Sequence, residues 1–541
     1  MVEIKKNQAT KLSGIETKQY FLLGNTAYLQ KEFDKAIAYF QQAIEIYEGV
    51  KDFHGVASVY HNLGAVANEQ RQFEEAIAYF QQALEIYENV KDCPNVANIY
   101  HNLGLVAREQ RQFEEATSYF QKALQIFEDL EDCHKVANGY LSLGVLLADQ
   151  RQYDEATSYF QKALQIFEDL EDFQGIAGVY QNLGLVTGEK RRFDEATSYF
   201  HKALEILENM GDFHRVAGVY HNLGALAAEG KNFQEATVYF HKALEIYQDA
   251  EDFSKVADIY HNLGSLAENQ EYFEEANVYF HKALEIYENE GHFHRVASVY
   301  NNLGIVARGQ QQFEEANSYF QKALDIYENP KDFYQVASVY HNLGTVAQEQ
   351  RQFEKAIAYF QKSLQIRENK RNFYEVAADY HHLGEVAEEQ RRFDEATSYF
   401  QKALNVYLEI YEDTGNFHNV AATYHKLGTV AGKQGQLKRM IAYFQKSLQV
   451  FEEVKDLNNL AKICHNLGVI TQAQQKFEEA IAYYEKAIQT FEELGDSWEA
   501  AKSCLLVGTI CVEQGSWYKG LDYLEKKFPN LQQRKRLSTS C

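Results

Sequence analysis

The sequence is poor in proline, cysteine, methionine and tryptophan. Its 541 residues include three prolines, six cysteines, three methionines and two tryptophans. An interior proline removes a helical hydrogen bond and clashes with the preceding turn, so a chain with so few prolines can be almost wholly helical. Six cysteines in a chain of this length exclude the dense disulfide framework of small secreted domains. We therefore expect a helical protein that is not held together by disulfides.

Basic residues are also scarce. The 53 lysines and arginines stand against 78 aspartates and glutamates, which gives a formal net charge of −25. Nucleic-acid binding draws most of its affinity from a basic face, so we expect no nucleic-acid partner, and the same acidity disfavours anionic membranes. The N-terminus lacks the apolar run of a signal peptide, and no stretch approaches the length of a membrane span. We expect a cytoplasmic protein.

What the sequence has in abundance is repetition. A Leu-Gly pair recurs every forty residues from Leu23-Gly24 to Leu383-Gly384. After a slip of four residues the pair resumes at Leu427-Gly428 and Leu467-Gly468, and it ends as Val507-Gly508. Self-similarity at a fixed period predicts an array in which each repeat buries its apolar face against the next. Such an array offers a long surface, whereas a catalytic site needs dissimilar residues that converge on one spot, so we do not expect an enzyme.

Each forty-residue repeat has the pattern of two amphipathic helices, A and B. Two apolar stripes at helical spacing are separated by a polar turn. In the repeat 52–91 the stripes are Tyr60, Leu63, Gly64 and Ala67 for helix A, and Ala76, Phe80, Ala83, Leu84 and Tyr87 for helix B. The expected N-caps of the A helices are Asp52, Asp92, Asp132, Asp172, Asp212 and Asp252. Glycine costs roughly 1 kcal/mol in a helix interior, so its recurrence predicts a backbone too close to admit a side chain.

These residues carry a family resemblance. The combination of Tyr60, Leu63, Gly64, Ala76, Phe80 and Ala83 resembles the tetratricopeptide repeat signature, with Tyr where that signature often has Trp. The resemblance covers about residues 16–528, although the repeat exceeds the usual length of about 34 residues by roughly six. Lengthened repeats of this kind resemble those of kinesin light chains, Pins-type polarity adaptors and bacterial regulatory arrays. The resemblance implies an all-α fold, a right-handed superhelical α-solenoid of about 13 helix-turn-helix repeats whose A helices line a concave groove.

The array divides into a regular and a divergent part. We expect a lead-in over residues 1–15, ten regular repeats over 16–410, three divergent repeats with a C-terminal cap over 411–528, and a basic flexible tail over 529–541. Four extra residues within 407–416 amount to about one helical turn and predict a longer B helix, with a hinge as the alternative. Cys93 and Cys133 replace a recurrent Phe, and Cys464 and Cys504 replace a recurrent Tyr, so we expect buried or half-buried thiols.

The residues just before each Leu-Gly pair are the candidate binding residues. The second of the two positions is most often asparagine: Asn62, Asn102, Asn182, Asn222, Asn262, Asn302, Asn342 and Asn466. These positions lie off the apolar stripe, and the resemblance implies that they face the concave groove. An Asn amide offers a donor and an acceptor to one peptide unit, so a ladder of amides would hold an extended chain. The alternative is that each Asn satisfies only a neighbouring helix or water.

The first of the two positions is most often histidine. The candidate groove histidines are His61, His101, His221, His261, His341, His381, His425 and His465. Packed helices lie roughly 8–10 Å apart, so adjacent A helices bring together at most two equivalent imidazoles, which are too few for zinc. We expect no metal and no cofactor. These histidines would add positive charge near pH 6, and acidification would then weaken the binding of a basic ligand.

Glutamate recurs five residues beyond the glycine, near the expected rim of the groove. The series is Glu69, Glu109, Glu189, Glu229, Glu349 and Glu389. These carboxylates favour a partner that is basic or rich in amides. Lysine does not recur at the His or Asn positions, apart from Lys426, so the basic clamp that holds a C-terminal carboxylate in some relatives is not evident.

The sequence therefore predicts a protein–protein interaction scaffold. Its groove would bind an extended peptide or a helix of a partner. The alternative is a regulatory or sensor subunit that changes its superhelix pitch on binding and controls a separately encoded enzyme. No nucleophile elbow, phosphate loop, HExxH or CxxC motif occurs in a chemically sensible context, so no catalytic residues are expected.

Overall fold

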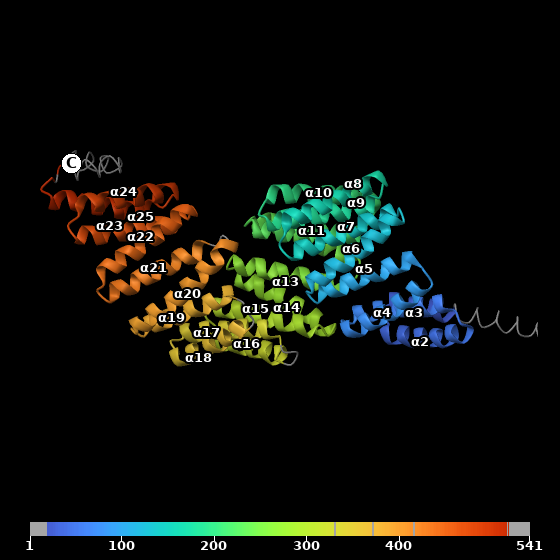
Figure 1. The fold of residues 1–541 in the computed structure, drawn as a ribbon. Helices are drawn as coiled ribbons and strands as arrows, with labels where there is room; N and C mark the ends of the chain where they lie inside the picture. Colours follow the sequence, from blue (N-terminus) through green and yellow to red (C-terminus); the bar gives the residue numbers. More distant parts are fainter. Residues whose placement is uncertain (1–18, 329–331, 370–372, 415–416, 517, 519–541) are drawn as a thin grey trace, which may run out of the picture. The chain divides into compact units, whose positions relative to one another are not determined.

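The structure is a computed structural model that describes residues 19–328, 332–369, 373–414, 417–516 and 518. Within these ranges all regular secondary structure is α-helical (Figure 1). The chain divides into two compact units, Met1–Leu266 and Ala267–Cys541, called here the N-terminal and the C-terminal unit. The expected lead-in, residues 519–528 of the expected C-terminal cap and the basic tail lie outside the described residues.

Helices of two kinds alternate along the chain, with the A helices bearing odd numbers and the B helices even ones. The A helices of the N-terminal unit are α3 (Phe53–Glu69), α5 (Cys93–Glu109), α7 (Cys133–Asp149), α9 (Phe173–Glu189) and α11 (Phe213–Glu229). Its B helices are α2 (Phe33–Val50), α4 (Phe73–Asn89), α6 (Phe113–Asp129), α8 (Tyr153–Asp169), α10 (Phe193–Met210) and α12 (Phe233–Asp249). The boundary between the two units falls within α13 (Phe253–Asn269).

The C-terminal unit continues the same alternation. Its A helices are α15 (Phe293–Gly309), α17 (Phe333–Glu349), α19 (Phe373–Glu389), α21 (Phe417–Lys433), α23 (Leu457–Ala473) and α25 (Ser497–Glu513). Its B helices are α14 (Phe273–Asn289), α16 (Phe313–Tyr327), α18 (Phe353–Asn369), α20 (Phe393–Thr414), α22 (Leu437–Glu453) and α24 (Phe477–Glu493). The A helix of the thirteenth repeat is α25. The predicted all-α solenoid of helix-turn-helix repeats is confirmed.

Aspartate side chains cap the A helices. The Asp52 carboxylate accepts a hydrogen bond from the backbone N–H of Gly55 at 3.0 Å, which satisfies one of the unpaired donors at the helix start. The other predicted caps make the same contact with the third residue of their helices: Asp92, Asp132, Asp172, Asp212 and Asp252. The sequence prediction of these helix starts is confirmed.

The recurrent glycine receives an aromatic ring from its own repeat. A Cβ built at Gly64 would lie 2.6 Å from Cε1 of Phe80, which belongs to helix B of the same hairpin. Phe80 and the glycine are both buried. The sequence reasoning expected a close backbone at this position, whereas the close neighbour is a phenyl ring. This contact therefore joins helices A and B within each hairpin and does not depend on the neighbouring repeats.

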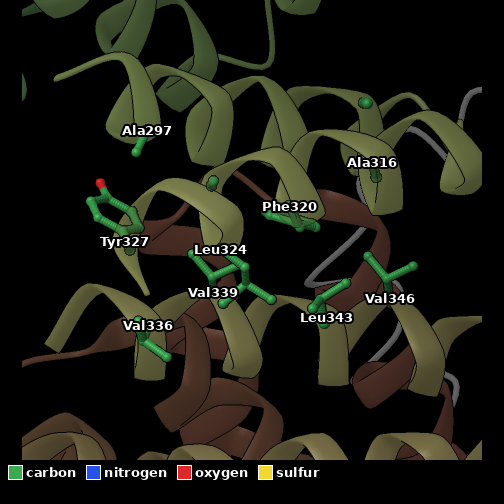
Figure 2. Packing of buried hydrophobic residues seen from close by; sticks show 11 residues of the cluster. Ala297, Ala316, Phe320, Leu324, Tyr327, Val336, Val339, Leu343 and Val346 are labelled. Atoms are coloured by element: carbon green, nitrogen blue, oxygen red, sulfur yellow. The ribbon is translucent and has the colours of Figure 1, made fainter. Parts of the chain in front are cut away.

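Each B helix packs on the A helix of the next repeat. Figure 2 shows this junction in the C-terminal unit, where Phe320 and Leu324 of α16 face Val339 and Leu343 of α17. All four side chains are buried. Burial of apolar surface is the main favourable term in folding, so each junction stabilises both repeats that form it.

A pair of tyrosines connects the two helices of many hairpins. The rings of Tyr100 and Tyr119 are stacked with their centroids 6.2 Å apart, and the ammonium of Lys122 lies 5.3 Å from the Tyr100 centroid. The Tyr100 hydroxyl also donates to the Glu88 carboxylate of the preceding B helix at 3.2 Å. These tyrosines are packing elements, as the sequence predicts, and they link neighbouring repeats as well.

The four-residue slip lengthens one B helix. Helix α20 runs for 22 residues, whereas α19 and α21 run for 17. The predicted longer helix is confirmed. In the following hairpin Met440 occupies the small Ala position, and its Sδ would lie 2.6 Å from a Cβ built at Gly432. A glycine therefore makes room for the larger side chain.

The cysteines fall into two groups. Cys464 and Cys504 are buried, as predicted, but Cys93 and Cys133 are exposed. Each of the exposed pair is the first residue of an A helix, a position at which Phe53 is exposed as well. The prediction of burial was wrong for these two thiols, because an aromatic residue at this position does not mark a core site.

Candidate peptide-binding site

The predicted asparagines and histidines lie on the A helices and are half-buried. They flank the buried Leu-Gly pair, so the rest of the apolar stripe holds them in place without covering them. For example, His61 and Asn62 precede Leu63, which is buried in the hairpin core. Side chains in this setting have limited freedom and keep part of their polar surface accessible.

Four of the predicted asparagines bond to the preceding A helix. Nδ2 of Asn102 lies 2.7 Å from Nε2 of His61, and Nδ2 of Asn262 lies 2.6 Å from Nε2 of His221. Asn342 donates in the same way to Asn301 at 2.9 Å, whereas Asn62 donates to Asn25, the residue after the glycine of the preceding repeat, at 2.7 Å. For Asn102, Asn262 and Asn342, the stacking of repeats places the second predicted position of one A helix beside the first position of the helix before it. The alternative weighed from the sequence, an Asn that satisfies a neighbouring helix, therefore holds for these amide nitrogens.

The remaining polar atoms of the series are open to a ligand. In the described part of the chain, no hydrogen bond reaches Oδ1 of Asn102 or Asn262, and none involves the side chain of Asn222 or Asn466. Asn182 donates to the carbonyl of Gly178 in its own helix at 2.8 Å. The asparagines thus form a row of oriented amides in which several oxygens, and two complete amides, lack a protein partner among the described residues.

Seven of the eight predicted histidines favour the neutral form more than a free imidazole does. Burial lowers the pKa of His61, His101, His221, His261, His341, His425 and His465. For His101 and His221 the pKa falls to about 4, through burial and then through the nearby ammonium of Lys135 or Lys255. The expectation of charge near pH 6 was wrong for His101 and His221, because the sequence does not reveal how strongly the imidazolium would be desolvated.

The predicted glutamates are exposed at the C-terminal ends of the A helices. Oε1 of Glu389 accepts from Nε2 of Gln348 at 2.8 Å, and Glu189 accepts from the Tyr153 hydroxyl at 3.3 Å. Glu349 lines a separate hollow of about 800 Å³ at the turns between helices A and B, with Arg308 4.0 Å away. These carboxylates border the A-helix face at its turn side.

Two hollows on the A-helix face collect the predicted asparagines and histidines. The first, of about 400 Å³ in the N-terminal unit, lies between α3, α5 and α7 and includes His61, His101 and Asn102. The second, of about 430 Å³ in the C-terminal unit, lies between α21, α23 and α25 and includes His425, His465 and Asn466. The sequence reasoning missed other residues that line them, among them Asn98, Lys135, Asn138 and Lys462.

The sequence reasoning also missed a second series of histidines. His54 is the second residue of α3, and its Nε2 donates to Oδ2 of Asp92, the N-cap of the next A helix, at 2.9 Å. The His54 ring meets Tyr87 edge-on at 5.5 Å. Equivalent bridges join His134, His214, His294 and His418 to Asp172, Asp252, Asp332 and Asp456. The signal was a histidine ten residues before the glycine in every second repeat from 54 to 294.

One junction in the C-terminal unit is polar. Nη1 of Arg367 lies 2.8 Å from Oδ1 of Asp379, and the Ser363 hydroxyl donates to Oδ2 of the same carboxylate at 2.8 Å. Nδ1 of the groove residue His341 lies 2.7 Å from Oδ1 of Asp379. Arg367, Asp379 and Ser363 are buried at the contact of α18 with α19. We refer to Ser363, Arg367 and Asp379 as the polar junction.

The A helices of this region also carry an ion pair at one of the predicted positions. Nζ of Lys426, the one lysine at an asparagine position, lies 2.6 Å from Oε1 of Glu385. Burial would raise the pKa of Glu385, but contacts with His381, His382 and Lys426 hold it well below its usual range. Lys426 is therefore neutralised from within the chain.

In the described ranges no three His, Cys, Asp or Glu side chains are arranged to hold a metal ion. Nor does any helix described there combine the length and apolar character needed to cross a membrane.

Comparison with known protein families shows a repeat of paired helices over most of the chain. The model of the tetratricopeptide repeat matches residues 15–89, 95–169, 175–249, 255–329, 335–409 and 419–493. The chain belongs to the tetratricopeptide repeat family. None of the curated proteins matches it. Membership of this repeat family supports a protein-interaction scaffold in general.

Several solved structures are similar to parts of this tetratricopeptide repeat chain. BtubC (BKLC) from P. vanneervenii is 22% identical, with 41% of this chain and 91% of that chain covered and a TM-score of 0.36. The apo form of RapI is 19% identical, with 50% and 98% covered and a TM-score of 0.42. A Rap protein complexed with Competence and Sporulation Factor is 17% identical, with 67% and 99% covered and a TM-score of 0.41. All three TM-scores are below 0.5, so function is argued from the residues of this chain.

Proposed function

We propose that the chain is a non-catalytic binding scaffold whose A-helix face takes an extended peptide or a helix from a protein partner. The observation that supports the proposal is that each unit has a hollow on the face of its own A helices, lined by residues of the asparagine and histidine series. Concave sites with a few oriented polar groups are where proteins bind their ligands.

The open amide atoms define what such a partner offers. Oδ1 of Asn102 or Asn262 can accept a backbone N–H, and the complete amides of Asn222 and Asn466 can pair with both groups of a peptide unit. The exposed glutamates at the turn side, such as Glu109 and Glu229, favour basic or amide-rich side chains along that border. The partner is therefore recognised mainly through its main chain, with charge as a secondary preference.

The test starts from a partner identified by cross-linked pull-down and mass spectrometry. Asn222→Ala and Asn466→Ala then remove the two amides that make no hydrogen bond in the described part of the chain, one in each unit. Each substitution should lower the affinity for the partner about fivefold, which corresponds to the loss of one net hydrogen bond of about 1 kcal/mol. Folding should survive, because neither amide supports a neighbouring helix.

Matched controls lie on the B helices. Gln81→Ala in α4 and Gln401→Ala in α20 remove amides that are exposed on the other helix of the hairpin. Their affinities should equal that of the unaltered chain. If the Gln variants weaken binding and the Asn variants do not, the partner uses the B-helix face and the proposal fails.

A regulatory subunit is the second proposal, and the departures within the C-terminal unit favour it. The polar junction and the 22-residue α20 depart from the regular repeat, and a scaffold that only binds a partner does not need such departures. In this case the pull-down should enrich one enzyme, and its activity should change when purified chain is added. An enriched partner with no activity, or with unchanged activity, would leave the scaffold as the function.

A further inference from the structure

The hollow between α3, α5 and α7 differs from the rest of the A-helix face in its charge. Lys135 is the single charged residue among those that line it, and no aspartate or glutamate is among them. Its volume of about 400 Å³ falls in the lower part of the range of about 300–1,000 Å³ for ligand pockets. A chain with a net charge of −25 thus has a positively charged hollow on its proposed binding face.

One member of the asparagine series is missing at this hollow. Ser142 occupies that position in α7, after Leu141 in place of the histidine. In the neighbouring repeat the asparagine reaches the preceding helix, since Nδ2 of Asn102 lies 2.7 Å from Nε2 of His61. Serine is too short to do the same, and no hydrogen bond involves the His101 ring nitrogens within the described residues. His101 therefore lines the hollow with an imidazole N–H available.

Lys135 projects its ammonium to the same hollow without an acidic partner. Its Nζ donates to Oδ1 of Asn98 at 3.0 Å and lies 5.7 Å from the ring centroid of Phe127. No ion pair of Lys135 occurs in the part of the chain that the structure describes. An ammonium has three N–H donors, so at least one is left for a ligand. Asp132 is nearby, but it caps the Lys135 backbone N–H and does not line the hollow.

A matched lysine shows what a neutralised site looks like. Lys255 is the third residue of α13, as Lys135 is of α7, and it lies in the same unit. Nζ of Lys255 lies 3.6 Å from Oδ2 of Asp258, so its charge is offset from within its own helix. The repeat position alone therefore does not create a free cation.

The imidazoles of the hollow do not add charge. Burial, and then the charge of Lys135, lower the pKa of His61 and His101. Both rings are neutral at pH 7, so the lining carries one positive charge together with neutral donors and acceptors. The positive end of the α7 dipole adds to this potential, since Lys135 lies in the first turn of that helix.

We propose that the Lys135 hollow binds the carboxylate of an aspartate or glutamate side chain from an extended protein segment. This inference rests on the proposed function, because the rest of the segment would lie along the A-helix face. The Lys135 ammonium supplies a charge-assisted hydrogen bond, and the N–H of His101 supplies a neutral one. The partner then carries an acid at this point, although the turn-side glutamates favour basic or amide-rich residues beside it.

The test uses ten-residue peptide libraries with a blocked N-terminus and an amidated C-terminus. The central residue is fixed as Glu, Gln or Lys in an otherwise random background, and binding to the full chain is followed by fluorescence anisotropy. The Glu library should bind about tenfold more tightly than the isosteric Gln library. Lys135→Met should abolish this ratio, whereas Lys135→Arg and the matched Lys255→Met should preserve it.

The outcomes separate this inference from the proposed function. Equal binding of the Glu and Gln libraries, or a Glu preference that survives Lys135→Met, overturns the acidic subsite and leaves peptide binding in place. Absence of binding by all three libraries overturns both proposals. Glutarate serves as a second probe, because it carries the carboxylate without a peptide. Saturable glutarate binding that requires Lys135, at concentrations where the Glu library shows no preference, would assign the hollow to a small dicarboxylate and overturn the peptide version.

Discussion

The junction of α4 with α5 and that of α18 with α19 occupy equivalent places in the array but are built from different chemistry. The first buries Ala83, Tyr87 and Ile99. At the matching positions, the second buries the residues of the polar junction, with Asp379 fully enclosed and bonded to both of its companions. The same backbone contact is thus made once with apolar packing and once with a buried ion pair.

This difference bears on how each junction tolerates change. An apolar contact loses stability in proportion to the side-chain volume that is removed. A buried ion pair behaves differently, because removal of one partner leaves an uncompensated charge while removal of both leaves none. The two junctions should therefore respond in opposite ways to single and to combined substitutions.

The largest effect should come from Asp379→Val, which copies an apolar junction at one position only. It leaves the buried Arg367 guanidinium with the partly exposed Glu375 carboxylate, 2.9 Å from its Nε, in place of two acidic partners, so local stability should fall by about 3–5 kcal/mol. Hydrogen exchange with mass spectrometry, followed on peptides of α18 and α19, measures this loss. The matched control Ile99→Val removes one methyl group at the equivalent place and should cost only about 0.5–1.5 kcal/mol. Similar costs at the two sites would remove the distinction between the junctions.

A combined substitution should reverse that loss. Arg367→Tyr, Asp379→Val and Ser363→Ala together recreate apolar packing of the kind seen at α4 and α5. Replacement of a buried ion pair by well-packed apolar residues is often neutral or stabilising by about 1–4 kcal/mol. Hydrogen exchange of the same peptides should therefore be as slow as in the unaltered chain, or slower. A triple variant as unstable as Asp379→Val would mean that the surrounding helices are shaped for charge.

A smaller effect separates junctions with and without the histidine bridge. Asp92 both caps α5 and bonds to His54 of the preceding A helix, whereas Asp132 caps α7 without such a bridge, because Pro94 stands at the equivalent position of α5. Loss of a cap costs about 1 kcal/mol. At pH 7, Asp92→Ala should therefore cost more than Asp132→Ala, by a few tenths to 1 kcal/mol for the exposed bridge. Hydrogen exchange at the start of each helix measures the difference.

The cost of Asp92→Ala should also depend on pH. Burial would raise the pKa of Asp92, but hydrogen bonds from Asn95 and His54 lower it overall from 3.8. A lowered folded-state pKa gives stability that is present above the unfolded value and is lost as the pH falls through the folded value. The contribution of the Asp92 carboxylate should therefore be complete above about pH 5 and shrink below about 4. A penalty that does not shrink below about pH 4 would contradict this assignment.

The smallest expected change is in partner affinity between pH 8 and 5.5. The pKa of His101 and that of His221 lie at about 4, so neither groove histidine gains charge in this range. Affinity for a partner bound on the A-helix face should stay constant within about twofold, by isothermal titration at each pH. A steep loss near pH 6 would restore the titrating groove that the sequence alone suggested.

The sequence predicts those features that depend on local spacing. Helix starts at Asp52 and its equivalents, the apolar stripes and the longer α20 all follow from residues within one hairpin. What the sequence reasoning missed depends on contacts between repeats. Half-burial of the imidazoles sets their charge, and Ser142 matters only because the asparagine it replaces would have reached His101. The polar junction was visible as Arg367 and Asp379 at apolar positions, but its pairing required the geometry of two stacked hairpins.

The glycine that receives a phenyl ring has a consequence for how such a chain can lengthen. Phe80 packs on Gly64 within one hairpin, so a duplicated stretch of forty residues contains both members of this contact. The duplicated hairpin also presents to its two neighbours the same A-helix and B-helix surfaces as the original. The identical stretches 117–132 and 157–172 fit growth by such duplication. The contact of α18 with α19 is the exception, because a repeat inserted between these helices would separate Arg367 from Asp379 and leave both charges without this partner.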